Sequence, residues 1–227
     1  MSFTIKSVAI AVITTTIGLS FTNRLIASAI EPSLLLNEAQ RELATMKSSH
    51  YQHHTDVNES KGVFNYDCSG FVDYALQKIA PAAYAEISIS KPSSQRPLAQ
   101  DFYNLFARST SKTSHWQQVT KVDRLQAGDI VAWLRPPEND SKNTGHVMII
   151  ASEPRINPDR ADEMLIPVID STSSPHANDT RRQGETGLGR GTIGAIFNSQ
   201  GKAIAYRWRG GLSQQAQATD IAFGRLR

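Results

Sequence analysis

The chain has one cysteine, few aromatic residues and no long apolar run. The first and the last of these exclude a disulfide-stabilised fold and an ordinary membrane-spanning helix. With a single cysteine among 227 residues, no disulfide can form within the chain, so a small disulfide-stabilised fold is excluded. The longest mostly apolar stretch, residues 8–21, is shorter than the about 20 residues that an ordinary membrane-spanning helix needs. Aromatic residues make up 7% and hydrophobic residues 40% of the chain, which is typical of a globular protein that buries a core.

The first 29 residues have the features of an export signal. Lys6 precedes the apolar stretch, and Ala27-Ser28-Ala29 follows it with the small-residue pattern at which signal peptidases cleave. Arg24 between the two is atypical of such signals. We therefore expect a signal peptide at 1–29 and a single domain at 30–227 that acts in the periplasm, in the cell envelope or outside the cell. The alternative is an uncleaved N-terminal anchor, which is the one way in which we expect a membrane to be involved.

Part of the positive charge belongs to that segment. Residues 1–29 contain two basic residues and no acidic one, so without them the formal net charge falls from +3 to +1. The remaining basic cluster, at Arg181-Arg182 and Arg190, lacks the interleaved aromatic side chains of a nucleic-acid groove. We therefore expect no nucleic-acid partner.

Hydrophobic spacing predicts helices first and an antiparallel sheet after them. The apolar residues from Leu34 to Met46 have helical spacing, a second helix is predicted from Cys68 to Ile79, and a short one over 97–108. Strands are predicted at 129–134, 146–151, 164–170, 192–197, 203–208 and 221–226. The polar, glycine-containing stretch 171–191 is predicted to be a long loop. This layout is α+β.

Cys68 is the candidate nucleophile. An unpaired thiol is either a small buried hydrophobic side chain or a reactive group. Asp67 stands at an N-cap position, so Cys68 would begin a helix. There the free N–H groups and the helix dipole would lower the pKa of the thiol and could hold an oxyanion. Gly70 would leave room for a close backbone neighbour or for a substrate, and Ser69 adds little bulk; both are candidate residues for oxyanion or substrate binding.

A cysteine nucleophile needs a base and a group that orients the base. His146 begins an apolar strand and is the preferred base. Asp170, at the end of the next apolar run, is the preferred third residue, and His176 is the alternative. The three histidines within 50–54 lack the cysteine or carboxylate pattern of a zinc site. We expect no metal and no cofactor.

Three motifs together resemble the NlpC-type branch of the papain-like cysteine peptidases. They are Asp67-Cys68-Ser69-Gly70-Phe71-Val72, Leu125-Gln126-Ala127-Gly128-Asp129-Ile130-Val131 and Gly145-His146-Val147-Met148-Ile149-Ile150, and the resemblance covers about residues 40–175. It implies a papain-like fold, in which N-terminal helices, one carrying the cysteine, pack on an antiparallel sheet that carries the histidine. It also implies cleavage of peptide or amide bonds, commonly in the stem peptides of peptidoglycan. Cys68 would then be the nucleophile, His146 the base and Asp170 the polar third residue.

The chain also departs from this family. The family usually has a tyrosine and a pair of glycines shortly before the cysteine motif, whereas this region reads Tyr51-Gln52-His53-His54-Thr55. Tyr51 would be the residue that donates a hydrogen bond near the oxyanion. The 171–191 stretch is also unusual for the family, and would cover the site or serve another substrate. Two alternatives to hydrolysis stay open: an acyltransferase that uses the same acyl-enzyme, and a non-catalytic envelope-binding module of the same fold.

Overall fold

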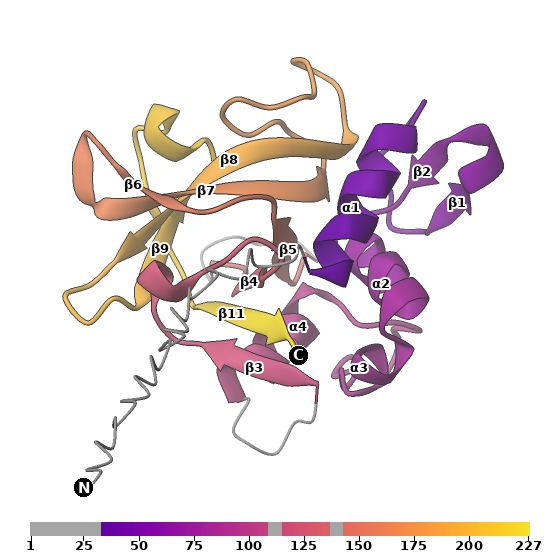
Figure 1. Ribbon diagram of the computed structural model, residues 1–227, viewed down its shortest axis with the longest axis horizontal. Coiled ribbons are helices and arrows are strands. Elements are labelled where there is room, and N and C mark those ends of the chain that lie inside the picture. The colour runs from indigo at the N-terminus through magenta and orange to yellow at the C-terminus, as the bar shows by residue number, and fades with distance from the viewer. Residues whose placement is uncertain (1–32, 109–114, 137–142) are drawn as a thin grey trace, which may run out of the picture. The chain divides into compact units, whose positions relative to one another are not determined.

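The computed structural model describes residues 33–108, 115–136 and 143–227 (Figure 1). The chain divides into two units, Met1–Glu31 and Pro32–Arg227, and the predicted signal peptide lies outside the described residues. Within the three described ranges, no helix is long and apolar enough to cross a membrane. The second unit is α+β, with a few helices packed on a large antiparallel sheet, which confirms this part of the predicted fold.

The helices lie mainly in the first half of the described chain. They are α1 (Leu34–Thr45), α2 (Cys68–Ile79), α3 (Pro81–Ala85) and α4 (Ala99–Arg108), with the short 3-10 helices η1 (Glu59–Lys61), η2 (Val122–Arg124) and η3 (Gly210–Leu212). Ser33 caps α1 by accepting a hydrogen bond from the Leu36 N–H at 3.2 Å. Pro81 begins α3, where its missing N–H costs no helical hydrogen bond. The predicted helices are thus confirmed, with ends that differ by a few residues.

The strands form a small hairpin and one large sheet. The hairpin pairs β1 (Asp56–Asn58) with β2 (Val63–Asn65). The large sheet contains β3 (Trp116–Val119), β4 (Ile130–Leu134), β5 (Gly145–Ile150), β6 (Arg155–Asn157), β7 (Arg160–Thr172), β8 (Gly187–Phe197), β9 (Ala203–Arg207), β10 (Gln217–Ala218) and β11 (Ile221–Leu226). Its order is β10-β9-β8-β7-β5-β4-β11-β3, with β6 paired to β7, and its pairings are antiparallel. Each predicted strand corresponds to one of these, and 164–170 is the later part of β7.

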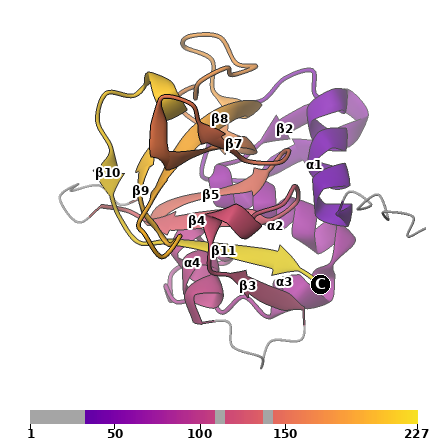
Figure 2. The ribbon, with the colours of Figure 1, turned by 60° about the vertical axis from the view of Figure 1, so that its left-hand side comes forward.

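The sheet carries an apolar layer on each face. On one face α2 packs against β5 and β7, and α4 packs against β4 and β11. Figures 1 and 2 show these helices gathered on one side of the strands. Successive residues of a strand point to opposite faces, so Ile149 belongs to the core under the helices and Met148 to a second core on the other face. The strand β5 is therefore buried on both sides, which explains its unbroken apolar sequence.

The sheet curls around this second core. The turn between β8 and β9 meets the segment before β4, where the Val122 N–H donates to the Gly201 carbonyl at 3.0 Å. Beside it, the Thr219 N–H donates to the Ile204 carbonyl at 3.4 Å. The first bond joins the β8–β9 turn to the segment before β4, and the second continues the pairing of β9 with β10. β9 also contacts β11, although these two strands lie far apart in the order of the sheet. The curl brings the end of β9 beside the start of β5, where His146 lies.

The hairpin of β7 and β8 shows that the predicted loop at 171–191 is too long. The two strands pair from Glu163 with Ile196 to Thr172 with Gly187, so the connection covers only 173–186. The glycines of β8 are typical of a loop by composition, but in the structure they allow close packing. A Cβ on Gly189 would lie 2.5 Å from the Arg181 Nε, and one on Gly191 would lie 2.7 Å from the His176 Cβ. Glycine at these positions lets the 173–186 loop fold back onto its own strand.

A buried carboxyl–phenol pair fixes the segment that leads into α2. The Tyr66 hydroxyl donates to Glu42 Oε2 at 2.7 Å, and both side chains are fully buried. Burial raises the pKa of Glu42 from its ordinary value of 4.5 to about 8. The main-chain carbonyl of Tyr66 accepts a hydrogen bond from the Ser171 hydroxyl at 2.6 Å. Tyr66 is thus held by α1 and by β7, two residues before Cys68.

Candidate active site

Cys68 is the first residue of α2, as the sequence predicts. Asp67 caps the helix, because its Oδ1 accepts hydrogen bonds from the Gly70 N–H at 2.8 Å and from the Ser69 hydroxyl at 3.2 Å. The backbone of α2 packs against β5. As a result the N–H of Val147, the residue that follows His146, is close enough to the Cys68 sulfur to lower the pKa of its thiol. Local capping and helix–sheet packing together bring the thiol to the histidine strand.

The surroundings of the sulfur differ from the prediction in one respect. We expected a thiol with a lowered pKa, but Cys68 is only 4% exposed, and burial raises the pKa of its thiol above the ordinary value. The negative charge of Asp67 acts in the same direction, while the N–H groups of Val147 and Ser69 oppose it. Removal from water disfavours a thiolate more than the helix start favours it. In this state, therefore, Cys68 is a neutral thiol.

His146 lies at the start of β5 with its ring largely buried. Its Nε2 lies 2.6 Å from Asp170 Oδ2, and no hydrogen bond to its Nδ1 occurs among the described residues. Burial lowers the pKa of His146, and its hydrogen bond to Asp170 opposes this. The ring packs edge-on against Trp208, with ring centroids 5.0 Å apart. His146 is therefore a neutral imidazole that donates through Nε2 and keeps Nδ1 as its basic atom.

Asp170 and His176 were alternatives for the third residue, and the structure brings both to the same place. Asp170 is the partner of His146, and His176 in turn contacts Asp170, with its Nε2 2.9 Å from the same Oδ2. Arg181 donates to Asp170 Oδ1 at 2.8 Å. Burial alone would raise the pKa of Asp170, but the charges and hydrogen bonds of its neighbours hold it well below its usual range. Asp170 is thus a buried carboxylate in contact with three basic side chains.

Two histidines and a carboxylate are also the kind of group that binds zinc or iron. The ligand atoms of His146, Asp170 and His176 lie within 4.8 Å of one another. However, both Nε2 atoms lie at hydrogen-bond distance from one oxygen, at 2.6 and 2.9 Å. A metal with bonds of about 2.0–2.2 Å holds tetrahedral ligands more than 3 Å apart. The arrangement therefore fits hydrogen bonds rather than a metal centre, and Arg181 would repel a cation here.

Ser69 and Gly70 do not form the open subsite that we expected. The Gly70 N–H and the Ser69 hydroxyl both donate to Asp67, so neither is free to bind an oxyanion. A Cβ on Gly70 would lie 2.7 Å from Thr55 Oγ1. Glycine is needed at this position because the chain packs closely against α2, which is the first of the two reasons that the sequence offers for it.

Arg96 is a site residue that the sequence analysis missed. Its Nη2 donates to both oxygens of Asp67, at 2.7 and 2.8 Å, and its Nη1 donates to Ser69 Oγ at 2.7 Å and to Asp73 Oδ2 at 3.1 Å. It therefore connects the N-cap with the second turn of α2 and neutralises the charge beside Cys68. Arg96 lies in a polar segment with no regular spacing, so no local signal identifies it.

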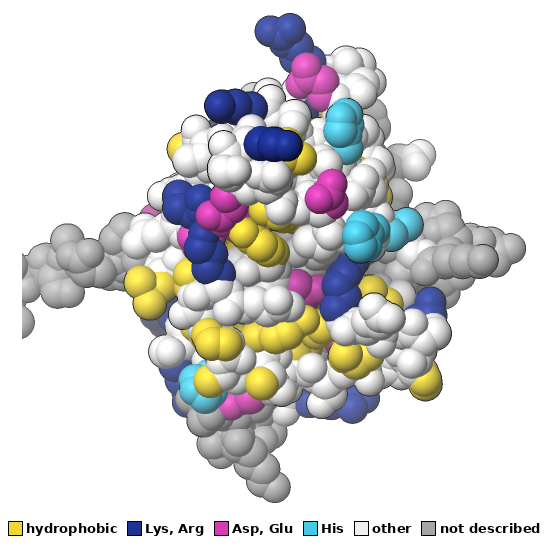
Figure 3. Space-filling model, turned by 90° about the vertical axis from the view of Figure 1, so that its right-hand side faces the viewer, with side chains coloured by type: hydrophobic (Ala, Val, Ile, Leu, Met, Phe, Trp, Pro, Cys, Tyr) yellow, Lys and Arg dark blue, Asp and Glu magenta, His cyan; other side chains and the backbone are white. Residues whose placement is uncertain are grey.

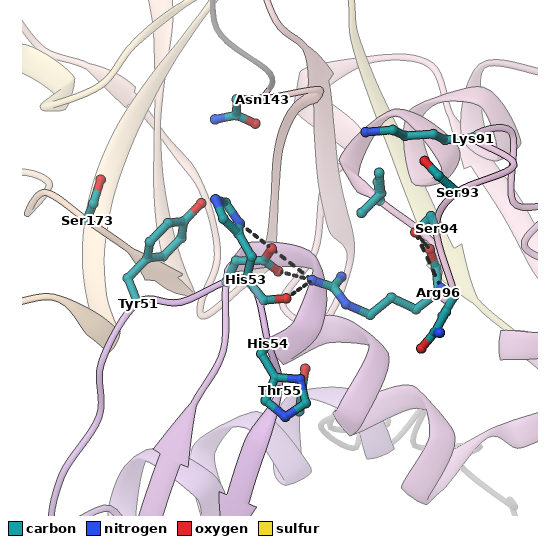
Figure 4. A pocket seen from close by; sticks show the side chains of 13 residues that line it. Tyr51, His53, His54, Thr55, Lys91, Ser93, Ser94, Arg96, Asn143 and Ser173 are labelled. Carbon is teal, nitrogen blue, oxygen red and sulfur yellow. Dashed lines mark hydrogen bonds and ion pairs between the residues drawn. The ribbon is translucent and has the colours of Figure 1, made fainter.

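Tyr51 borders two cavities, the larger of which is shown in Figure 4. The larger, of about 920 Å³, is bordered by Tyr51, Asp67 and Arg96, and the smaller, of about 220 Å³, by Tyr51, His146 and Trp208. Burial raises the pKa of Tyr51, and its hydroxyl therefore stays a hydrogen-bond donor. The negative charge of a Cys68 thiolate would add to this rise, which places Tyr51 within electrostatic reach of the sulfur.

The face shown in Figure 3 carries histidine and basic side chains interspersed with acidic and uncharged ones, so no continuous basic surface is visible there.

Among the described residues, Cys68, His146, Asp170 and Tyr51 lie in one region between α2 and the curled sheet. Comparison of the chain with protein-family models, with curated proteins and with solved structures finds no match.

Proposed function

We propose that the protein is an exported, papain-like cysteine hydrolase that cleaves peptide or amide bonds, with peptidoglycan stem peptides as its substrates. One observation carries this proposal. α2, which begins with Cys68, packs against β5, which carries His146, and His146 Nε2 lies 2.6 Å from Asp170 Oδ2. A cysteine at a helix start, a histidine with a bare nitrogen on the strand against which that helix packs, and a carboxylate that fixes the ring are the parts of a nucleophile–base–orienter triad.

The protonation states favour a particular order of steps. His146 Nδ1 takes the proton from the neutral Cys68 thiol as the sulfur attacks the carbonyl carbon, and the carbonyl oxygen becomes an oxyanion. N–H groups at the start of α2 and the Tyr51 hydroxyl are the candidate donors to this oxyanion. When the tetrahedral intermediate collapses, His146 returns the proton to the leaving amine and a thioester remains on Cys68. Water, deprotonated by His146, then hydrolyses the thioester.

The two cavities support an extended substrate. Tyr51, Asn143 and Ser173 border both of them, so the cavities adjoin one another. A peptide that passes Tyr51 would place its scissile amide near Cys68, with one end in each cavity. The larger cavity is bordered mostly by side chains with hydroxyl, amide or charged groups, which suit a polar peptide better than an apolar ligand.

The experiment is digestion of isolated peptidoglycan and of synthetic stem peptides by the full chain, analysed by mass spectrometry. We expect cleaved peptides with the unmodified protein and with His50→Gln, whose exposed side chain borders neither cavity. We expect no cleavage with Cys68→Ala. Turnover by Cys68→Ala would refute the proposal. An acyl product that forms only when an amine is added would instead show an acyltransferase.

A non-catalytic binding module is the second candidate, and the burial of Cys68 favours it. Alkylation with iodoacetamide separates the two candidates without a known substrate. A catalytic thiol is expected to react in the folded protein and to react more slowly in His146→Ala. Equal and slow rates in both proteins, together with binding of stem peptides without turnover, would indicate the binding module.

A further inference from the structure

We propose that His176 is a positioning residue that carries two ring protons and, with Arg181, holds Asp170 in the orientation that fixes the tautomer of His146. The inference rests on the proposed function of His146 as a base. It assigns a role to the 173–186 loop, in which the side chain of His176 is completely buried against Asp170.

Both ring nitrogens of His176 face hydrogen-bond acceptors. The Nδ1 lies 2.9 Å from the main-chain carbonyl oxygen of Trp208, and a carbonyl can only accept, so Nδ1 carries a proton. The Nε2 lies 2.9 Å from Asp170 Oδ2. Because Asp170 is ionised, this oxygen also accepts, so Nε2 carries the second proton. His176 is therefore a cation, and its side chain is completely buried.

The same geometry excludes His176 as the base. A general base needs a nitrogen with a free lone pair, and His176 has none while both of its ring protons are engaged. His146 differs because only its Nε2 is engaged. The two histidines therefore have separate roles, with His146 exchanging the proton and His176 supporting the carboxylate between them.

Four donors fix the position of Asp170. His146 and His176 donate to Oδ2, and Arg181 donates to Oδ1 at 2.8 Å and to the main-chain carbonyl at 3.3 Å. The carboxylate cannot turn without breaking several of these bonds. A fixed carboxylate keeps the His146 proton on Nε2 and leaves Nδ1 bare, which is the form that can accept a proton from a thiol.

When His146 is left out, the formal charges of the other side chains in the cluster sum to zero. His176 and Arg181 are positive, and Asp170 and Asp179 are negative. Asp179 accepts from the His176 main-chain N–H at 2.7 Å and from the Arg181 Nε at 2.8 Å. The positive charges of His176 and Arg181 oppose protonation of His146. Removal of the His176 charge would leave a net negative cluster, so the pKa of His146 would rise.

The test is nitrogen-15 NMR of the histidine rings in the full chain. In the unmodified protein we expect a proton on both ring nitrogens of His176, and one ring proton on His146, at Nε2. In His176→Gln we expect the pKa of His146 to rise by at least about half a unit, with a mixture of its two tautomers. The control, His50→Gln, is expected to leave His146 unchanged.

Each outcome decides the inference. A ring nitrogen of His176 without a proton overturns it, and this measurement needs no variant that might fail to fold. An unchanged tautomer and pKa of His146 in a folded His176→Gln protein also overturn it. The NMR test does not depend on turnover. A Cys68→Ala protein that stays active would refute the proposed function, whereas the protonation of His176 is decided by the NMR measurement alone.

Discussion

Replacing Glu42 by glutamine should remove a pH-dependent loss of stability. Burial raises the pKa of Glu42 in the folded protein to about 8, above its ordinary value of 4.5. Between these values the folded chain holds a proton that the unfolded chain has released, so the free energy of unfolding falls as the pH rises. The slope is about 1.4 kcal/mol per pH unit, which amounts to roughly 4 kcal/mol between pH 5 and pH 8. Glutamine does not titrate, and its amide oxygen can still accept from Tyr66.

Urea unfolding of both proteins at pH 5, 6, 7 and 8 measures this effect. We expect the stability of Glu42→Gln relative to the unmodified protein to increase with each step and to level off above about pH 8. Glu38→Gln is the matched control on the same helix, because Arg41 and Lys78 lower the pKa of Glu38. Glu38 is ionised in both states from pH 6 to pH 8, so its difference should change far less there than that of Glu42→Gln, with only the small change that follows from the contribution of the Glu38 charge to the pKa of Glu42. A constant difference for Glu42→Gln as well would refute the reasoning.

Two further substitutions test the packing of α4 on the sheet and the charges around α2. Gly224→Ala would place a Cβ 2.2 Å from the Phe106 ring, so we expect its free energy of unfolding in urea to fall by about 1–3 kcal/mol. In the control Gly211→Ala the nearest atom lies at 3.4 Å, so the loss should be less than half as large, and equal losses would contradict the steric argument. Arg96→Met would remove the arginine that pairs with Asp67, so the free energy of unfolding should fall by about 3 kcal/mol. The alkylation of Cys68 should also become slower, and an unchanged alkylation rate would show that the Arg96 charge does not influence the thiol.

Local signals in the sequence explain which elements could be predicted. Asp67 followed by a helical apolar pattern marks the start of α2, and the apolar run after Gly145 marks β5. Strands of two or three residues, such as β10 and β6, are too short to show an alternating pattern. The elements that carry Cys68 and His146 are among the longer ones, so these two residues were placed correctly on the fold from sequence alone.

The properties of the site depended on tertiary contacts and could not be predicted. The direction of the Cys68 pKa depends on how completely α2 and β5 exclude water, which no local pattern reveals. Arg96 reaches Asp67 from 29 positions away. The glycines of β8 are characteristic of loops by composition, although in this fold they make space for Arg181 and His176. Their purpose can be recognised only when the returning loop is seen.

The burial of Cys68 has a consequence for resistance to oxidation. Peroxides attack the thiolate and not the thiol, and they must reach the sulfur to do so. With 4% exposure and a raised pKa, Cys68 is protected in both ways, and no second cysteine is available to regenerate it through a disulfide. An activated thiolate that formed only during attack on a substrate would be exposed to oxidants briefly, so the resting protein should tolerate an oxidising environment.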